Sequence, residues 1–296
     1  TPPEAIGHRA LAANLSDLAA MGAGPRLALL SMALPSSYPV DDLDRLVSAL
    51  ADLADRSDIV VAGGNLTRSP GPLMIDITAV GHVKPRQVLA RRGARPGDAL
   101  YVSGQVGSAA AGLAMLRALA PDAKTPNVGP FRAVDGRRHA SENQDDSLDR
   151  DACVRCYLYP TPRLKLGTQL ARNRAATACI DLSDGLGAAV SQLAEASGVG
   201  ATIVASQLPL HAAARQWFEA TDLDAVTAAV AGGDDYELLF AVRPGRYGRL
   251  RNALRHGEAT ATKIGVCTAD KTVVIQREID GRLIESPLPV PFRHFQ

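Results

Sequence analysis

The chain has 296 residues with a formal net charge of +1, and 46% of its residues are hydrophobic. That balance is typical of a globular protein with one or two domains, and it provides no field that would attract nucleic acid or an anionic membrane. No apolar run approaches the roughly 20 residues of a membrane-spanning helix, and the first residues lack the pattern of a secretory signal. Four cysteines are too few for a disulfide framework, so the composition predicts a protein of the reducing cytoplasm.

The first third of the sequence predicts helices that alternate with strands. Apolar residues recur at helical spacing in two stretches and form short β-type runs in three others. A turn-forming cluster at 94–98 follows, and we place a domain boundary there, between residues 1–93 and 94–296. The expected helices are 4–23 and 41–56, and the expected strands are 27–34, 58–62 and 73–83.

The second part continues the alternation after an interruption. A strand at 99–103 and a helix at 108–119 are followed by a segment rich in Pro, Asp, Arg and Asn, which predicts an exposed, flexible insertion at 121–150. The whole pattern favours layered α/β or α+β architecture over a bundle or a sandwich. The remaining expected helices are 163–172, 184–196, about 209–219, 223–230 and about 244–255, and the remaining expected strands are 176–180, 200–204, 236–242 and short strands at the end.

Four polar clusters lie where apolar elements end, which is where loops present functional groups on a rigid frame. In the first cluster, Asn14 and Asp17 are three residues apart on a predicted helix and therefore lie close together beside its apolar stripe. A carboxylate there could face a cleft or hold a cation. A solvated helix face is the alternative interpretation.

The second cluster is Gly63-Gly64-Asn65-Leu66-Thr67-Arg68, directly after a predicted strand. Glycines let backbone N–H groups approach an anion, Thr67 offers a hydroxyl, and Arg68 offers a guanidinium fork that suits phosphate. The segment does not match the GxxxxGK[ST] phosphate-binding loop. A plain glycine-rich turn is the alternative.

The third cluster is Asp181-Leu182-Ser183-Asp184, at the junction of a predicted strand and a predicted helix. Two carboxylates and a hydroxyl within four residues suit Mg²⁺, which prefers one or two carboxylates together with phosphate oxygens and water. The alternative is that Ser183 or Asp184 is only a helix N-cap, although a cap would explain one of these residues and not all three.

The fourth cluster is Gly232-Gly233-Asp234-Asp235-Tyr236-Glu237, which enters a predicted strand. Its acids could contact a positively charged substrate group or could belong to a polar turn, and the pattern leaves both open. The sequence contains neither a GxSxG elbow nor an HExxH pair. Acids, glycines, Thr and Arg without a nucleophilic His or Cys favour metal-assisted phosphoryl transfer.

Seven segments in the same order resemble the signatures of the thiamine-monophosphate kinase family. The resemblance extends from residue 4 to the end of the chain, apart from 121–150. The segments are Asn14–Gly22 (NLSDxAAMG), Gly63–Arg68 (GGD/N-x-T-R), Ser103–Gly107 (SGxLG), Pro160–Leu164 (RPxPR), Asp181–Leu186 (D-[IL]-S-D-G-L), Gly232–Phe240 (GGEDYELLF) and Phe292–Phe295 (aromatic-x-HF).

This resemblance implies the two-domain fold of the aminoimidazole-ribotide synthetase superfamily. An N-terminal α/β domain would form a barrel with that of a second copy in a homodimer, and a C-terminal α/β domain would follow. ATP and Mg²⁺ would lie in the cleft between the domains, with thiamine monophosphate as substrate and thiamine diphosphate as product. Transfer would be direct and in line, and metal ions and arginine would offset the repulsion between two anionic phosphates.

The resemblance also implies roles for individual residues. Asp17, Asp181 and Asp184 would hold Mg²⁺, and Asp184 and Arg68 would be the catalytic groups. Gly63, Gly64, Asn65, Thr67, Arg68 and Ser183 would lie at ATP. Asp234, Asp235 and Tyr236 would lie near the thiamine moiety, and Phe292 or Phe295 would stack on its pyrimidine.

The sequence departs from the family pattern at three points. The family has an earlier segment with GDDAA-like and TTD motifs that supply further metal and nucleotide ligands, and this sequence begins after that point. Asn65 stands where many relatives have Asp, and Asp234 replaces a more usual Glu. Two alternatives therefore stay open: another ATP-dependent enzyme of the superfamily, and a non-catalytic dimeric relative that binds nucleotide.

Overall fold

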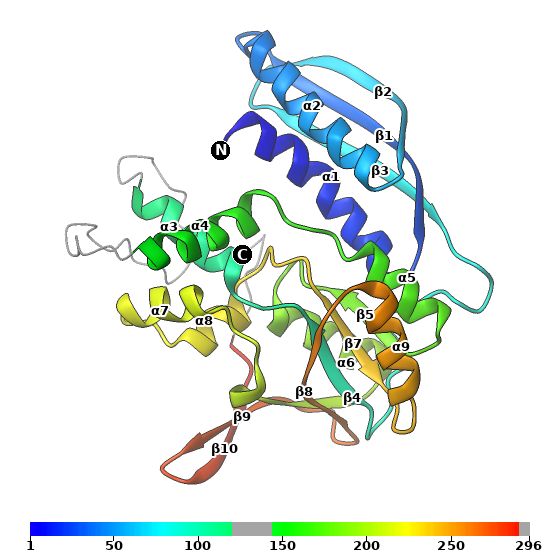
Figure 1. Cartoon of the computed structure of the whole chain (residues 1–296), viewed down its shortest axis with the longest axis vertical. Coiled ribbons are helices and arrows are strands. Elements are labelled where there is room, and N and C mark those ends of the chain that lie inside the picture. Colours follow the sequence, from blue (N-terminus) through cyan, green and yellow to red (C-terminus); the bar gives the residue numbers. More distant parts are fainter. Residues whose placement is uncertain (120–143, 290–296) are drawn as a thin grey trace.

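The computed structural model describes residues 1–119 and 144–289 (Figure 1). The first part forms a three-stranded sheet in the order β2-β1-β3, in which β1 is parallel to β2 and antiparallel to β3. Helices α1 and α2 cover one face of this sheet, and their leucines form a buried cluster with β1. The elements are α1 (Pro3–Ala20), β1 (Gly24–Pro35), α2 (Val40–Arg56), β2 (Val60–Ser69) and β3 (Met74–His82).

The second part is built on a mixed seven-stranded sheet in the order β10-β9-β6-β8-β4-β7-β5. Only β6 and β9 pair in parallel among these strands. The elements are β4 (Ala99–Ser103), α3 (Ser108–Leu119), α4 (Gln144–Leu158), α5 (Leu164–Arg172), β5 (Ala178–Asp181), α6 (Leu186–Ser197), β6 (Gly200–Val204), the 3₁₀ turn η1 (Ala205–Gln207), α7 (Ala212–Ala220), α8 (Ala225–Ala231), β7 (Leu238–Val242), α9 (Tyr247–Gly257), β8 (Ala261–Thr268), β9 (Val273–Ile279) and β10 (Arg282–Pro287).

The central strands of the larger sheet are buried on both faces. Every residue of β4, β5 and β7 is buried, since α6 packs on one face and α5 and α9 pack on the other. Strands buried on both faces appear in a sequence as continuous apolar runs. This is why 99–103 and the apolar part of 236–242 were recognisable, and the α/β class with mixed sheets is confirmed. The boundary between 1–93 and 94–296 stays a prediction.

The structure corrects the expected end of the second strand. The sequence predicted a strand at 58–62 followed by a glycine-rich segment, whereas β2 continues to Ser69 and pairs with β1 along that length. Gly64 lies so close to β1 that a Cβ atom there would be 1.7 Å from the carbonyl oxygen of Leu30. The close strand pairing therefore accounts for this glycine without an anion.

A second correction concerns the predicted insertion at 121–150. Helix α4 begins at Gln144, so the loop prediction was wrong for 144–150, while 121–143 lies outside the described residues. The helix crosses α3 closely, because Gly112 lacks the Cβ atom that would lie 2.1 Å from the carbonyl oxygen of Cys153. This tertiary contact stabilises a helix whose own sequence has almost no apolar periodicity.

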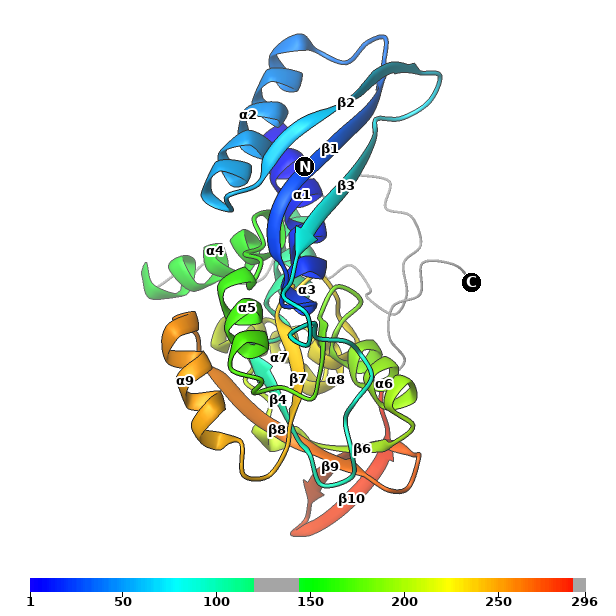
Figure 2. The same cartoon turned by 90° about the vertical axis from the view of Figure 1, so that its right-hand side faces the viewer.

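Helix α1 joins the two parts of the molecule. One of its faces packs on the small sheet, and its C-terminal half lies against α5 and β5 (Figures 1 and 2). Gly167 on α5 permits this approach, since a Cβ atom there would lie 2.0 Å from the carbonyl oxygen of Ala19. Polar residues of α1 are thereby placed beside the end of β5. Among the described helices, none combines the length and the apolar character needed to cross a bilayer.

Candidate active site

Two of the predicted metal ligands come together where α1 meets the end of β5. Asp181 is the last residue of β5 and is buried, and it accepts a 2.8 Å hydrogen bond from the Ser16 hydroxyl of α1. Burial raises the pKa of the Asp181 carboxyl; the Ser16 bond opposes that shift and the neighbouring Asp17 adds to it. Partial desolvation also raises the pKa of Asp17. Asp181 is buried and Asp17 beside it is exposed, and two neighbouring carboxylates that repel each other form a place where a bound cation would be stabilising.

The third and fourth sequence clusters lie side by side at this point. The backbone N–H of Asp234 donates to the carbonyl oxygen of Ser183 at 2.8 Å, and that of Tyr236 donates to Leu182 at 3.2 Å. Gly185 has a φ of +90°, and a Cβ atom there would lie 2.1 Å from the carbonyl oxygen of Gly232. The two segments that resemble family signatures are therefore locked together by backbone contacts.

The N-cap explanation of the third cluster is wrong. Helix α6 begins at Leu186, and its N-cap residue is Gly185. Neither Ser183 nor Asp184 is needed in that position. Both residues lie between the end of β5 and the start of α6, directly after the buried carboxylate of Asp181.

Asp234 and Tyr236 adopt backbone conformations that side chains other than glycine rarely take. Their φ angles are +68° and +50°. The Tyr236 hydroxyl donates to Asp234 at 3.2 Å, and the Arg9 guanidinium of α1 forms an ion pair with the same carboxylate at 3.0 Å. Arg9 also lies over the ring of Tyr157, 4.3 Å from its centroid. Strained non-glycine residues held by such contacts are typical of functional sites.

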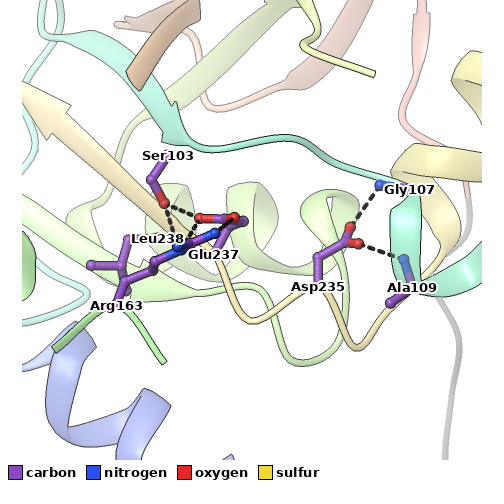
Figure 3. A network of polar contacts seen from close by, with 7 residues as sticks. All are labelled: Ser103, Gly107, Ala109, Arg163, Asp235, Glu237 and Leu238. Carbon is purple, nitrogen blue, oxygen red and sulfur yellow. Dashed lines mark hydrogen bonds and ion pairs between the residues drawn. The ribbon is translucent and has the colours of Figure 1, made fainter. Parts of the chain in front are cut away.

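Asp235 caps the start of helix α3 (Figure 3). Its two carboxylate oxygens accept hydrogen bonds from the backbone N–H groups of Gly107 at 2.8 Å and Ala109 at 3.1 Å. Burial raises the pKa of the Asp235 carboxyl to about 7, although these bonds act in the opposite direction. The expected contact between Asp235 and a substrate stays a prediction, and the observed contacts give it a role in the fold.

The raised pKa of Asp235 predicts how stability depends on pH. The folded value, about 7, lies above the unfolded value of about 4, so the folded protein binds this proton more readily. The stabilisation is complete below pH 4 and is lost as the pH rises through 7. We expect the free energy of unfolding, measured by urea titration, to fall over this range relative to Asp235→Asn, which lacks the titrating group. A difference between the two proteins that stays constant with pH would contradict this assignment.

The sequence placed Glu237 only among the acids of the fourth cluster, whereas the structure shows it at the centre of a buried polar network (Figure 3). The Ser103 hydroxyl donates to Glu237 Oε2 at 2.5 Å and accepts from the backbone N–H of Leu238 at 2.9 Å. The Arg163 guanidinium donates through Nε at 2.8 Å and forms a second bond through Nη2. Three family-like segments, at 103–107, 160–164 and 232–240, therefore meet at one carboxylate.

Gly104 is required by this network. Its φ is +55°, and a Cβ atom there would lie 2.0 Å from Oε1 of Glu237. We expect Gly104→Ala to lower the free energy of unfolding by about 2 kcal/mol or more, as measured by urea titration. Gly245→Ala is the matched control, because its φ is +86° and no atom lies within 4 Å of the added Cβ. Equal losses in the two variants would show that the Glu237 contact is unimportant.

The second cluster is not brought next to the others within one chain. Gly63–Arg68 lies on β2, at the end of the molecule away from β5 and α6 in both views (Figures 1 and 2). Because side chains alternate along a strand, Thr67 and Arg68 point to opposite faces of β2. Their expected contact with phosphates stays a prediction. Phe292 and Phe295 lie outside the described residues.

The carboxylates at this site suit Mg²⁺ only together with oxygen atoms from a bound molecule. Within 1–119 and 144–289, no group of three or more His, Cys, Asp or Glu side chains is arranged to hold a metal ion. Asp17 and Asp181 would supply two hard carboxylate ligands, and Mg²⁺ commonly completes such a site with phosphate oxygens and water. The residues present therefore fit a cation that arrives with a phosphorylated ligand.

Two known protein families match consecutive parts of the chain. The N-terminal domain of AIR synthase related proteins matches residues 1–83, and the C-terminal domain of the same group matches residues 95–278. Thiamine-monophosphate kinase from Escherichia coli (strain K12) is 37% identical over 270 residues, which cover 90% of this chain and 74% of that protein. The enzyme of the same description from Bacillus subtilis is 30% identical and covers 99% of this chain and 82% of its own length.

Solved structures give a consistent result. AaThiL complexed with AMPPCP and TMP has a TM-score of 0.78 and 28% identity over 100% of this chain and 82% of that chain. Thiamine-monophosphate kinase from Stenotrophomonas maltophilia K279a also has a TM-score of 0.78, with 33% identity over 96% of this chain and 81% of that chain. HypE from E. coli, at 23% identity and a TM-score of 0.73 over 96% of this chain and 80% of its own, shares the fold.

Proposed function

Because the chain belongs to the thiamine-monophosphate kinase family, we propose that it transfers the terminal phosphoryl group of ATP to thiamine monophosphate, giving thiamine diphosphate. The observation that carries this proposal is the meeting of Asp17 and Asp181 beside the Ser183–Asp184 segment. The group lies where α1 meets the end of β5. A relative of the same fold binds both AMPPCP, an ATP analogue, and TMP.

In this proposal, Asp17, Asp181 and Asp184 would hold Mg²⁺ together with the phosphates of ATP. A bound Mg²⁺ would supply positive charge that offsets the repulsion between the two anionic phosphates. Ser16 orients Asp181 through its hydroxyl, and Ser183 lies beside the same ligands. The protein has to position and neutralise its substrates, since phosphoryl transfer of this kind needs no covalent enzyme intermediate.

Asp234 and Tyr236 are proposed to lie at the thiamine moiety, whose thiazolium ring is positively charged. The Asp234 carboxylate is shared with Arg9 and the Tyr236 hydroxyl, so it is already oriented before a substrate binds. Phe292 or Phe295 would stack on the pyrimidine. Asp235 supports the site indirectly, because it fixes the start of α3 beside this loop.

The second cluster enters the proposal through a second copy of the chain. The sheet face opposite α1 and α2 exposes large apolar side chains, with Leu29 42%, Val60 65% and Val80 43% accessible. Both β2 and β3 are edge strands in this sheet. We propose that two such sheets join as a barrel across a homodimer, which covers the apolar face and removes the open edges. Gly63–Arg68 would then lie at the interface and could reach a partner's site.

A charge on that apolar face is expected to separate the dimer. Leu29→Glu places a carboxylate where β1 would meet the second sheet, so the dissociation constant of the dimer should rise by about tenfold or more. Sedimentation velocity over a dilution series measures the change. Val40→Glu is the matched control, since Val40 is 71% accessible at the start of α2, away from this face. A monomeric parent chain would contradict the barrel.

The fold shared with HypE shows why fold alone does not choose the reaction. The activity proposal is tested by supplying ATP and Mg²⁺ with either thiamine monophosphate or thiamine and separating the products by chromatography. Phosphorylation of the monophosphate and not of thiamine supports the proposal, because the proposed acceptor is a phosphate oxygen. Nucleotide binding without either product would favour a non-catalytic relative.

A further inference from the structure

A pocket of about 290 Å³ lies apart from the candidate active site. Three segments that are distant in sequence form it: the connection after β3 at 86–93, the end of α5 with its following turn at 171–177, and the turn between β7 and α9. Figure 1 shows α5 and α9 side by side at this edge of the molecule. Four of the lining residues are arginines, namely Arg86, Arg174, Arg243 and Arg246, and we call this site the arginine pocket.

The positive charge of the arginine pocket is largely uncompensated. Asp98 lies 3.7 Å from Arg243, and its carboxylate also accepts from the Thr177 hydroxyl at 2.8 Å. Among the residues that the structure describes, no carboxylate forms an ion pair with Arg86, Arg174 or Arg246. Four guanidinium groups and one carboxylate give the pocket a formal net charge of +3. Such a concave cationic surface attracts anions.

The pKa of Arg246 is consistent with an excess of positive charge in the pocket. Partial burial lowers the pKa of its guanidinium, the neighbouring Arg243 and Arg249 lower it further, and Asp98 opposes these shifts. Its Nη1 group donates to the carbonyl oxygen of Arg174 at 3.2 Å, which ties α9 to the turn after α5. Arg86 and Arg174 both have positive φ angles, +65° and +49°. The chain therefore gathers like charges here in spite of their repulsion and of two strained backbone positions.

The charge and the volume of the arginine pocket limit the kinds of ligand that it could bind. Guanidinium forks match the oxygen pairs of phosphate groups. The formal charge of the pocket, +3, exceeds the negative charge of a single phosphate group. A diphosphate group carries a negative charge of about that size. A volume of about 290 Å³ lies below the range of about 300–1,000 Å³ typical of pockets that enclose a whole drug-sized ligand. The lining matches a compact anion better than an enclosed nucleotide.

We propose that the arginine pocket binds a diphosphate group, either as inorganic diphosphate or as the end of a larger molecule. The site is separate from the proposed kinase site. None of its lining residues belongs to the four clusters, and Thr177 precedes β5 whereas Asp181 ends it, about 13 Å further along the strand. The inference therefore does not depend on the proposed reaction.

Isothermal titration calorimetry of the full chain with inorganic diphosphate, in EDTA and at low salt, tests this proposal. EDTA removes Mg²⁺ and so suppresses binding at the carboxylate site. The parent chain should bind diphosphate more tightly than orthophosphate. Arg243→Ala and Arg246→Ala should each weaken binding by about tenfold or more. Arg251→Ala, which removes the same charge from an exposed position on α9, and Asp184→Asn should leave binding within about twofold.

The two possible sources of the diphosphate group are separated by adding ADP and thiamine diphosphate as further titrants. Tighter binding of one of them that Arg243→Ala and Arg246→Ala weaken and Asp184→Asn does not identifies a larger molecule, and tighter binding of inorganic diphosphate identifies the free anion. Arg86→Ala, in the exposed connection, serves as a second variant if circular dichroism shows that a change at α9 disturbs folding. Three results would overturn the proposal: no binding by the parent chain, equal weakening in Arg251→Ala, or stronger retention of a DNA oligonucleotide than of diphosphate by the same arginines.

Discussion

Arg163→Ala is expected to lower the free energy of unfolding by about 3 kcal/mol, and with it the melting temperature by about 6 °C or more. The reason is that the buried carboxylate of Glu237 would remain without its counter-charge. Glu237 has only 6% of its side chain accessible, and Arg163 is its counter-charge. Ser103 alone cannot replace an ion pair in a buried position. We take the lower end of the range usual for broken buried pairs, because 36% of the Arg163 side chain is accessible to water.

A matched set of variants separates this effect from the simple loss of an arginine. Arg172→Ala removes an exposed arginine at the end of α5 and should change stability by less than about 0.5 kcal/mol. Adding Glu237→Gln to Arg163→Ala should recover part of the loss, since the buried charge disappears. Thermal unfolding followed by circular dichroism measures all three. No recovery in the double variant would show that the charge of Glu237 is not the cause.

Asp181→Asn is expected to abolish most of the activity without lowering stability. An asparagine can still accept the Ser16 hydroxyl, and it removes a carboxylate whose ionised form is disfavoured by burial. Loss of one metal-binding carboxylate should reduce kcat by about 100-fold or more. The pairing of a large kinetic loss with unchanged or higher stability distinguishes a functional carboxylate from a structural one.

The control for Asp181→Asn is Asp55→Asn, the same chemical change on the exposed surface of α2. Its activity should equal that of the parent chain. The kinetic assay and a urea titration of each variant are sufficient. If Asp181→Asn loses stability and activity together, the residue supports the fold, and the proposed metal site would have to be placed elsewhere.

The elements that the sequence predicted best are those whose burial leaves a local pattern. The strand at 99–103 is buried on both faces, and helix α2 carries a clear apolar stripe, so each produced a pattern that needed no knowledge of its partners. The order of the strands in the sheets was not predictable in this way. The placement of β4 between β7 and β8 depends on contacts between segments more than 130 residues apart.

The same distinction applies to the candidate site. Asp181 and Asp17 were recognised from short motifs, but their meeting through Ser16 depends on how α1 packs across β5. The capping role of Asp235 and the buried network of Glu237 were missed, since their partners, at 107–109 and at Ser103 and Arg163, are far away in sequence. The resemblance at 103–107 and 160–164 was the only available sign that these segments matter.

The most direct test of the proposed function is turnover by the chain itself. The purified protein is incubated with ATP, Mg²⁺ and thiamine monophosphate, and thiamine diphosphate is measured by chromatography, with Asp184→Asn as the matched control. We expect product from the parent chain and a reduction of about 100-fold or more in the variant. Absence of thiamine diphosphate from the parent chain, or equal product from Asp184→Asn, would contradict the account.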